Sequence, residues 1–198
     1  MDIGQLQQQL IELKQKHDTV EKAWKTRHGN KDLLEFLVEV MPRALEAERC
    51  SIFILDPFSK NAWVQAGTGL AERQVTVPTA GSIVGRVILE GKMLVEYDME
   101  GQVGAHDLVA TQTGFVTRSM ICIPVPGVTR KQVVGAIQVL NKKGDGKFTK
   151  TDLALLEKLV FVLQMHVENI YVRQELARMM SVMKKQIDEL TAKLHAKA

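Results

Sequence analysis

Mostly apolar side chains recur near both ends of the chain at alternating steps of three and four residues. This spacing places them in one narrow stripe on a helix whose other faces carry Lys, Glu and Gln, which is typical of the seam of a coiled coil. A stripe of this kind cannot be buried by its own helix, so it requires a partner. The two stripes consist of Ile3, Leu6, Leu10, Leu13, His17, Val20 and Trp24 near the N-terminus, and Leu176, Met180, Met183, Ile187, Leu190 and Leu194 near the C-terminus.

Two arrangements would supply that partner. In a homodimer, a second copy of the chain covers the stripes, and in a monomer the two terminal extensions pack against each other. A second copy supplies matching stripes most simply, so we expect a homodimer.

The segment between the two stripes shows the pattern of strands joined by turns. The runs "RCSIFILD" and "AWVQAG" flank "PFSKN", a turn-forming stretch, and are expected to form a β-hairpin. The runs "RSMICIPVP" and "KQVVGAIQVL" predict two longer strands around "GVTR", and "MLVEYD" predicts a short one. A short helix that ends at Gly91 is expected in "PTAGSIVGRVILEGK", and a helical turn in "AHDLVATQ".

Two further helices are expected to flank these strands. Asn30 follows a break at Gly29 and can cap one helix, and Thr149 with Asp152 forms a capping-box-like start for a long C-terminal helix. The chain is therefore expected to be an α+β protein. Its parts are an N-terminal coiled-coil-like helix at 1–29, a central domain at 30–170 and a C-terminal coiled-coil extension at 171–198.

Composition narrows the class of protein. A chain of 198 residues suits one sizeable domain plus extensions. Its net charge of +3 is too small to imply a nucleic-acid partner. The apolar runs fall short of the roughly 20 residues of a membrane span, and the N-terminus has no signal-peptide core. Cys50 and Cys122 lie in strand-like runs and are interpreted as buried thiols, so a cytoplasmic location is expected.

The stretch "NKKGDGKFTKTD", residues 141–152, has the outline of a calcium-binding loop. The chemistry argues against calcium, because Lys143 puts a cation where an oxygen ligand is needed, and Asp152 is shorter than the usual bidentate Glu. A strand, not a helix, is expected before the loop. The five His, including His106, show no ligand spacing, so we expect neither a metal ion nor a haem.

The order of these segments resembles a GAF domain, most closely the GAF domains of cyclic-nucleotide phosphodiesterases and related adenylyl cyclases. The runs "CSIFILD" and "TGFVTRSMICIPV" match two core strands of that family, over a resemblance that spans residues 33–170. Asn141, Lys142, Phe148 and Asp152 match its Asn-Lys…Phe…Asp-Glu signature, although the final acid is Leu153 here. The resemblance implies an antiparallel sheet with flanking helices, and a structural clamp in which Lys142 pairs with Asp152.

The resemblance also implies a small-ligand pocket between the sheet and the segment from Ile83 to Thr117. In relatives that bind cyclic nucleotides, hydroxyls and backbone amides surround the phosphate and ribose. The matching hydroxyls are those of Ser51, Thr113 and Thr117, and the amides of Ile83 and Val84 begin a short helix that can face a phosphate.

This sequence lacks several of the side chains that contact the purine in those relatives. Positions that contact the base in those relatives carry Ala66 and Ala110, and a strand acid is replaced by Gln138. A cyclic nucleotide, another small ligand and no ligand at all therefore remain open as interpretations.

These features predict a non-catalytic regulatory or sensory module that signals through dimeric helices, with a protein partner for its output. One alternative is a structural dimerisation module whose pocket is filled by its own side chains. Another is a free methionine sulfoxide reductase, which also uses a GAF domain but needs accessible thiols of low pKa. Cys50 and Cys122 do not suit that chemistry, because both lie in apolar strands.

Overall fold

The structure of the protein is a computed structural model that describes residues 3–26, 29–71, 73–99, 114–129, 131–144 and 147–195. The chain forms two compact units. Met1–His28 and Val172–Ala198 make up the first, which we call the helical unit, and Gly29–Tyr171 makes up the second, the sheet unit. No helix in the described ranges is long and apolar enough to cross a membrane.

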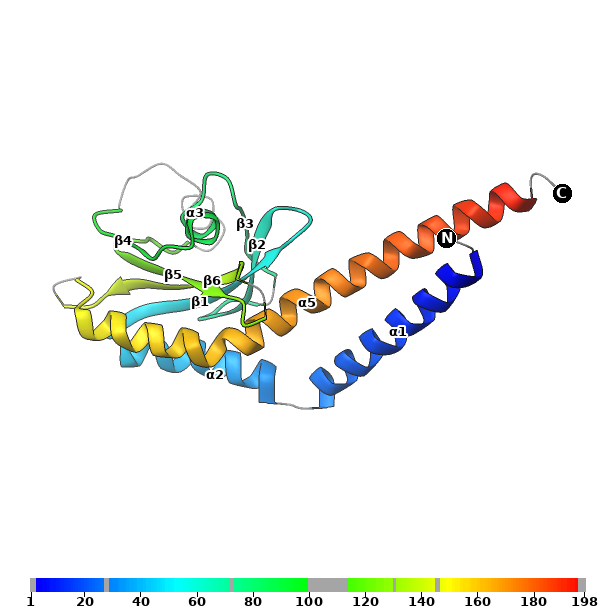
Figure 1. Ribbon diagram of the computed structural model, residues 1–198. Helices are drawn as coiled ribbons and strands as arrows, with labels where there is room; N and C mark the ends of the chain where they lie inside the picture. The colour runs from blue at the N-terminus through cyan, green and yellow to red at the C-terminus, as the bar shows by residue number, and fades with distance from the viewer. Residues whose placement is uncertain are drawn as a thin grey trace. The chain divides into compact units, whose positions relative to one another are not determined.

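The sheet unit is built on a six-stranded antiparallel sheet in the order β3-β2-β1-β6-β5-β4 (Figure 1). The long strands β1 and β6 pair at its centre. Four of the ten residues of β6 are β-branched, and β1 carries Ile52, Phe53 and Ile54, which are residue types that favour strands. The strands are β1 (Ala47–Asp56), β2 (Asn61–Gly67), β3 (Thr76–Pro78), β4 (Leu94–Glu96), β5 (Met120–Pro126) and β6 (Val133–Lys142).

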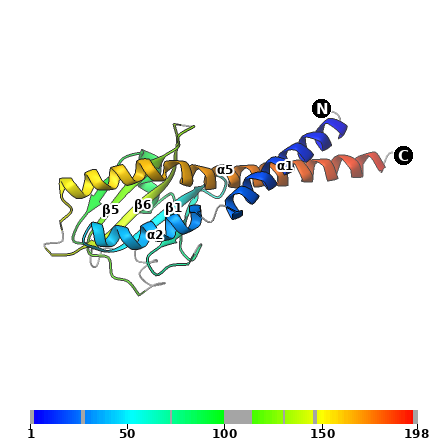
Figure 2. The ribbon, with the colours of Figure 1, turned by 90° about the horizontal axis from the view of Figure 1, so that it is seen from below.

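Different helices cover the two faces of this sheet. One face lies against α2 (Gly29–Ala44) and the first part of α5 (Lys150–His195), and we call it the helix-pair face (Figures 1 and 2). The other lies beneath α3 (Ile83–Glu90), and we call it the α3 face. Because side chains alternate along a strand, Ile52 and Ile54 of β1 face the helix pair, whereas Phe53 joins the core beneath α3.

The short helix α3 is bounded by a side-chain cap and a glycine. The hydroxyl of Ser82 accepts a hydrogen bond from the Gly85 N–H at 2.9 Å, and Gly91 ends the helix in the left-handed conformation, with φ of 63°. Gly85 also lets the helix lie close to the preceding segment, since a Cβ there would come within 2.2 Å of the Thr79 carbonyl oxygen.

This architecture confirms the α+β fold expected from the sequence, with its antiparallel sheet, flanking helices and long C-terminal helix. The two hairpins, the helix that ends at Gly91 and the strand that precedes residues 141–152 are confirmed as well. The strand β3 was not expected, because three residues are too few to show a periodic pattern. The helical turn expected in "AHDLVATQ" lies outside the described residues.

The helical unit contains α1 (Ile3–Thr26) and the part of α5 that follows Tyr171. Leu6 of α1 and Ile187 of α5 are buried within it. Both helices also line an open groove, through residues that include Leu10, Ile11 and Met180. Among the stripe residues whose side chains the structure describes, Leu6 and Ile187 are therefore covered within one chain, whereas Leu190 is exposed.

Gly135 of β6 lies at a tightly packed point of the sheet. A Cβ at this position would come within 2.3 Å of the Phe53 carbonyl oxygen and 3.0 Å of Val167 Cγ1 on α5. The absence of a side chain therefore allows both β1 and α5 to approach β6.

We expect Gly135→Ala to lower the free energy of unfolding by about 2–4 kcal/mol, because backbone atoms of β1 must move to admit the methyl group. Urea denaturation of the full chain measures this loss. Gly69→Ala is the control, since that site has open space and a φ of 69°, so only the conformational cost of about 1 kcal/mol applies. An equal loss at both positions would contradict the packing argument.

Candidate functional site

A short polar row crosses the otherwise apolar α3 face of the sheet. Ser51 of β1 pairs with Gly67 on one side and with Gln138 on the other, and Gln138 pairs in turn with Cys122. Directly paired residues point to the same face, so the four lie in one line. Ser51 and Gln138 are only 4% and 8% exposed, so two polar side chains are buried in an apolar setting.

These buried polar groups retain hydrogen-bonding capacity. The Nε2 of Gln138 donates to the Met120 sulfur at 2.9 Å, and a thioether is a weak acceptor. A Cβ on Gly67 would come within 2.9 Å of the Ser51 hydroxyl oxygen, so glycine leaves that hydroxyl its space. The row is thus equipped to bind the polar part of a small molecule.

A cation and an aromatic ring border the polar row. Arg49 lies two residues before Ser51 on the same face and pairs with Leu140. Its guanidinium carbon lies 3.9 Å from the centroid of the Phe115 ring, and Phe115 in turn packs against the core beneath α3. Thr117, two residues further along, is buried.

The residues expected to bind a ligand occupy different parts of this region. Ser51 lies in the polar row, and Thr117 lies in the segment that borders it. Ile83 and Val84 begin α3, where their N–H groups have no acceptor within the helix, and the Val84 side chain packs in the core. Thr113 lies outside the described residues.

The positions expected to read a purine also differ in placement. Ala66 pairs with Ile52, so it faces the helix pair and cannot contact a ligand beside Ser51. The reason is an irregularity between Ile52 and Phe53 in the pairing of β1 with β2, which shifts the alternation of side chains by one residue. Gln138 does lie on the ligand side, and Ala110 is outside the described residues.

Asn141 ties the segment before β5 to the end of β6. Its Oδ1 accepts from the N–H groups of Arg118 and Ser119 at 2.7 and 3.2 Å, and its Nδ2 donates to the Val116 carbonyl at 2.9 Å and to Glu48 at 2.8 Å. Its backbone is left-handed, with φ of 56°, a conformation that asparagine tolerates better than most residues. Asparagine therefore satisfies both the backbone and the side-chain requirements of this site.

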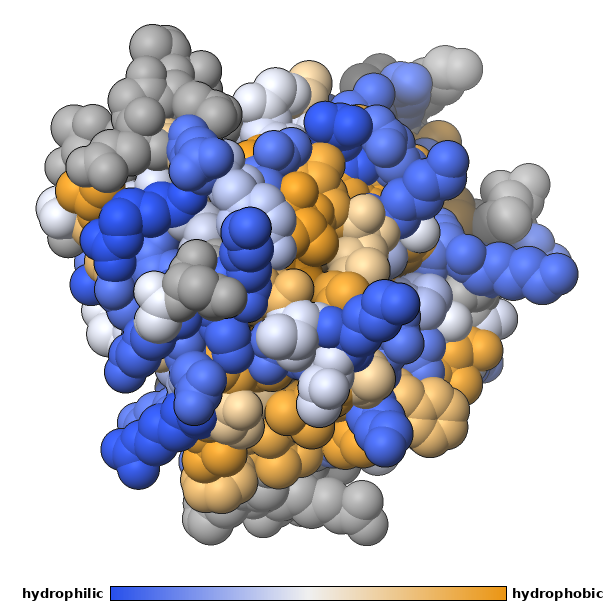
Figure 3. Space-filling view, turned by 90° about the vertical axis from the view of Figure 1, so that its left-hand side faces the viewer, coloured by the Kyte–Doolittle hydropathy of each residue, from blue (hydrophilic) through white to orange (hydrophobic). Residues whose placement is uncertain are grey.

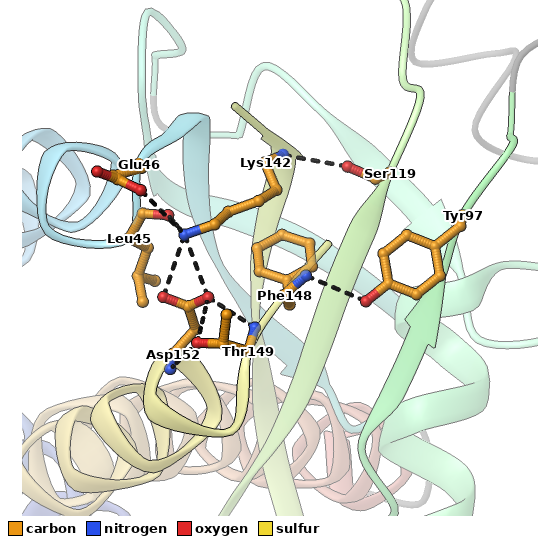
Figure 4. Close-up of polar contacts among 8 residues, drawn as sticks. All are labelled: Leu45, Glu46, Tyr97, Ser119, Lys142, Phe148, Thr149 and Asp152. Carbon is orange, nitrogen blue, oxygen red and sulfur yellow. Dashed lines mark hydrogen bonds and ion pairs between the residues drawn. The ribbon is translucent and has the colours of Figure 1, made fainter. Parts of the chain in front are cut away.

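Lys142 joins three elements through one buried ammonium group (Figure 4). Its Nζ donates to the Leu45 carbonyl at 2.8 Å, lies 3.1 Å from Oδ2 of Asp152 and 3.6 Å from Glu46. The side chains of Lys142 and Asp152 are 8% and 12% exposed. A cation at the C-terminal end of α2 and an anion in the first turn of α5 both complement the helix dipoles.

Asp152 also completes the capping box expected at the start of α5. Its Oδ2 accepts from the Thr149 N–H at 2.7 Å, and the Thr149 hydroxyl accepts from the Asp152 N–H at 3.2 Å. Burial opposes the charged carboxylate, but the hydrogen bonds from Thr149 and Lys142 outweigh it and lower the pKa of Asp152. Beside it, the Phe148 N–H donates to the Tyr97 hydroxyl at 3.1 Å. The role of this group of residues as a clamp stays a prediction.

Glu168 of α5 was not identified from the sequence. It is buried and accepts from the N–H groups of Val128 and Thr129 at 2.7 and 3.1 Å, in the turn between β5 and β6. A carboxylate beside the apolar Val167 in the buried stretch of α5 was the only sequence signal for such a contact. Through it, α5 holds one end of the two strands that carry Cys122 and Gln138.

The two cysteines lie on opposite faces of the sheet. Cys122 is part of the polar row, whereas Cys50 pairs with Val139 and faces the helix pair. Both are buried, and burial raises the pKa of the Cys50 thiol to about 12 and raises the pKa of Cys122 as well. They cannot form a disulfide with each other in this fold. Among the described residues, no group of three or more His, Cys, Asp or Glu could hold a metal ion.

We expect Asp152→Asn to lower the free energy of unfolding by about 2 kcal/mol or more, because Lys142 then stays buried without its counter-ion. A double-mutant cycle with Lys142→Met should give a coupling of about 0.5 kcal/mol or more. The exposed pair Lys185–Glu189, at 3.9 Å, is the control and should couple more weakly.

The same pair predicts a pH dependence. The lowered pKa of Asp152 adds stability above its unfolded pKa, and this stability is lost as the pH falls through the folded pKa. The difference between wild type and Asp152→Asn should therefore shrink below about pH 4. Urea denaturation between pH 2 and pH 7, as rough limits, measures it, and a constant difference would contradict the pairing.

Solved structures of other proteins share this fold. The GAF domain of a phosphoenolpyruvate-protein phosphotransferase from Coxiella burnetii aligns with a TM-score of 0.61 and 15% identity, over 86% of this chain and 95% of that chain. A type II free methionine-R-sulfoxide reductase from Thermoplasma acidophilum aligns with a TM-score of 0.54 and 16% identity, over 70% of this chain and 92% of that chain. At these identities the likeness shows the fold alone.

Relatives by sequence are far longer proteins. A dual 3',5'-cyclic-AMP and -GMP phosphodiesterase 11A from Takifugu rubripes is 28% identical over 57% of this chain, which covers 14% of that relative. A cone cGMP-specific 3',5'-cyclic phosphodiesterase subunit alpha' from Mus musculus is 31% identical over 44% of this chain, which covers 10% of that relative. The model of the GAF domain family matches residues 31–166. The chain therefore belongs to the GAF domain family.

Proposed function

We propose that the sheet unit is a non-catalytic sensory module that binds a small ligand on its α3 face. The observation that carries this proposal is the polar row, in which Ser51 and Gln138 are buried among apolar side chains. A ligand that forms hydrogen bonds with these two side chains gains directional contacts that an apolar surface does not offer.

Cyclic nucleotides are the first ligand class we propose. Two relatives carry cyclic-nucleotide phosphodiesterase names, and the match to the GAF domain family model, residues 31–166, includes Ser51 and Thr117. Hydroxyls of this kind can donate to a phosphate or a ribose. Gln138 can donate and accept at once, so it can bond to the edge of either purine.

We further propose that the ligand state is passed on through α5. This helix is continuous from Lys150 to His195, and its first part carries Asp152 and Glu168, which hold the ends of β6 and the β5–β6 turn. A change on the sheet therefore acts on the same helix that extends into the helical unit. A protein partner would read that change.

Dimerisation is supported by apolar side chains that one chain leaves uncovered. Phe36 on α2 and Phe161, Val162 and Met165 on α5 are all more than half exposed. Figure 3 shows apolar side chains gathered along the lower edge of the molecule, the side on which α2 and α5 lie in Figure 1. Exposed apolar patches of this kind mark interaction sites, and we propose a second copy as the partner.

Two other functions remain as alternatives. A structural dimeriser is favoured by the apolar cluster that fills much of the α3 face, including Phe53, Val84 and Val87. A methionine sulfoxide reductase is disfavoured, because its thiols must be accessible and able to resolve, whereas Cys50 and Cys122 are buried on opposite faces. The same free thiols support a reducing compartment such as the cytoplasm.

We expect cyclic AMP or cyclic GMP to bind the full chain with a Kd below about 100 μM. Ser51→Ala combined with Thr117→Val removes two hydroxyls with little change of volume, so binding should weaken about tenfold or more. Calorimetric titration measures both values, and Ser59→Ala in the exposed β1–β2 turn is the control. If neither nucleotide binds in this range, the cyclic-nucleotide proposal fails.

We expect Phe161→Glu combined with Met165→Glu to convert a dimer into a monomer of unchanged fold. Both side chains are exposed in a single chain, at 77% and 64%, so charge at these positions acts on association rather than on the core. Sedimentation equilibrium gives the mass, and circular dichroism checks the fold. Glu157→Ala with Lys158→Ala, on the same helix, is the control. A variant that keeps the dimer mass would exclude this patch as the interface.

A further inference from the structure

Arg49 is a cation with unused hydrogen-bonding capacity beside the polar row. It is half-buried, and its guanidinium group lies over the Phe115 ring. Within the described part of the chain, Arg49 forms no ion pair and its side chain donates no hydrogen bond. When a guanidinium group stacks on an aromatic ring, its N–H groups still point outward from the edge of the guanidinium plane. Two of them can donate to two oxygens of one carboxylate or phosphate.

The nearest acid in sequence is already engaged elsewhere. Glu48 forms an ion pair with Arg118 through Oε1 and accepts from Asn141 Nδ2 at 2.8 Å through Oε2. Successive side chains of a strand point to opposite faces, so Glu48 and Arg49 also diverge. Among the residues that the structure describes, no acid pairs with Arg49 on the α3 face.

We propose that Arg49 binds the anionic group of the ligand, a carboxylate or phosphate, while Ser51 and Gln138 bind a neutral polar part. This inference rests on the proposed ligand-binding function and specifies the chemistry of its ligand. Arg49 and Ser51 are two residues apart on one strand, so their Cα atoms lie about 7 Å apart. We therefore expect a ligand whose negative charge lies about 7 Å from a group that both donates and accepts hydrogen bonds.

The anion subsite can be tested with inorganic phosphate as the probe. Thermal unfolding of the full chain is compared in sodium phosphate and in sodium chloride of equal ionic strength. A third sample in sodium acetate tests a carboxylate in place of phosphate. We expect phosphate or acetate to raise the Tm of the wild type by roughly 2 °C or more over chloride. Arg49→Met should lose this gain, and Arg49→Lys should keep part of it.

A matched control separates the subsite from general salt effects, since phosphate stabilises many proteins by exclusion from their surface. Arg73 lies over the Trp63 ring at the same distance of 3.9 Å, and Trp63 faces the helix pair because it pairs with Ile54. Arg73→Met should therefore keep the full gain. An equal gain in wild type and Arg49→Met, or no gain at all, overturns the proposal.

The outcomes also separate this inference from the proposed function. A gain that depends on Arg49, with no binding of cyclic AMP or cyclic GMP, supports the anion subsite and points to another anionic ligand. Binding of a cyclic nucleotide that Arg49→Met leaves unchanged supports the proposed function and overturns the role of Arg49. If Arg49→Met fails to fold, Arg49→Gln replaces it in both measurements.

Discussion

The buried ammonium group of Lys142 connects the end of β6 to both helices on the helix-pair face. Removing a charged group from water costs several kcal/mol, and this cost is offset only where acceptors surround the charge, as the Leu45 carbonyl and the Asp152 carboxylate do here. Because Leu45 follows α2 and Asp152 lies in the first turn of α5, the ammonium group contacts the ends of both helices on the helix-pair face. Asp152 also caps α5 through Thr149, so the ion pair and the helix start form one cooperative network.

The neighbouring residue connects the other side of the sheet. Asn141 holds the backbone from Val116 to Ser119, which borders the proposed ligand site, while Lys142 holds the two helices. The two residues are covalent neighbours at the end of β6. A displacement of the segment that carries Phe115 and Thr117 therefore acts directly on the backbone that positions Lys142. The proposed sensory function requires a physical connection of this kind between the proposed ligand site and α5.

Local patterns predicted most of the fold, because strand alternation, helix caps and turn residues act over a few positions. The cap at Thr149 and the stop at Gly91 are examples. The contacts that define the candidate site were harder to foresee, since they join distant segments. Nothing local relates Arg49 to Phe115, or Glu168 to Val128, which is 40 residues away. An irregularity in strand pairing, invisible to any local pattern, turned Ala66 to the opposite face.

The polar row also helps to distinguish a ligand-binding module from a structural dimeriser whose α3 face is filled by its own side chains. A module that served only to dimerise would gain most from an uninterrupted apolar core beneath α3. Instead Ser51 and Gln138 are buried there, and burying a hydroxyl and an amide gains less free energy than burying apolar side chains of similar size. The contact of Gln138 with the Met120 sulfur is a weak hydrogen bond, because a thioether is a weak acceptor. A ligand shifts the state of such a module only by the difference between its affinities for two states, and hydrogen bonds to Ser51 and Gln138 that form in one state alone would supply that difference.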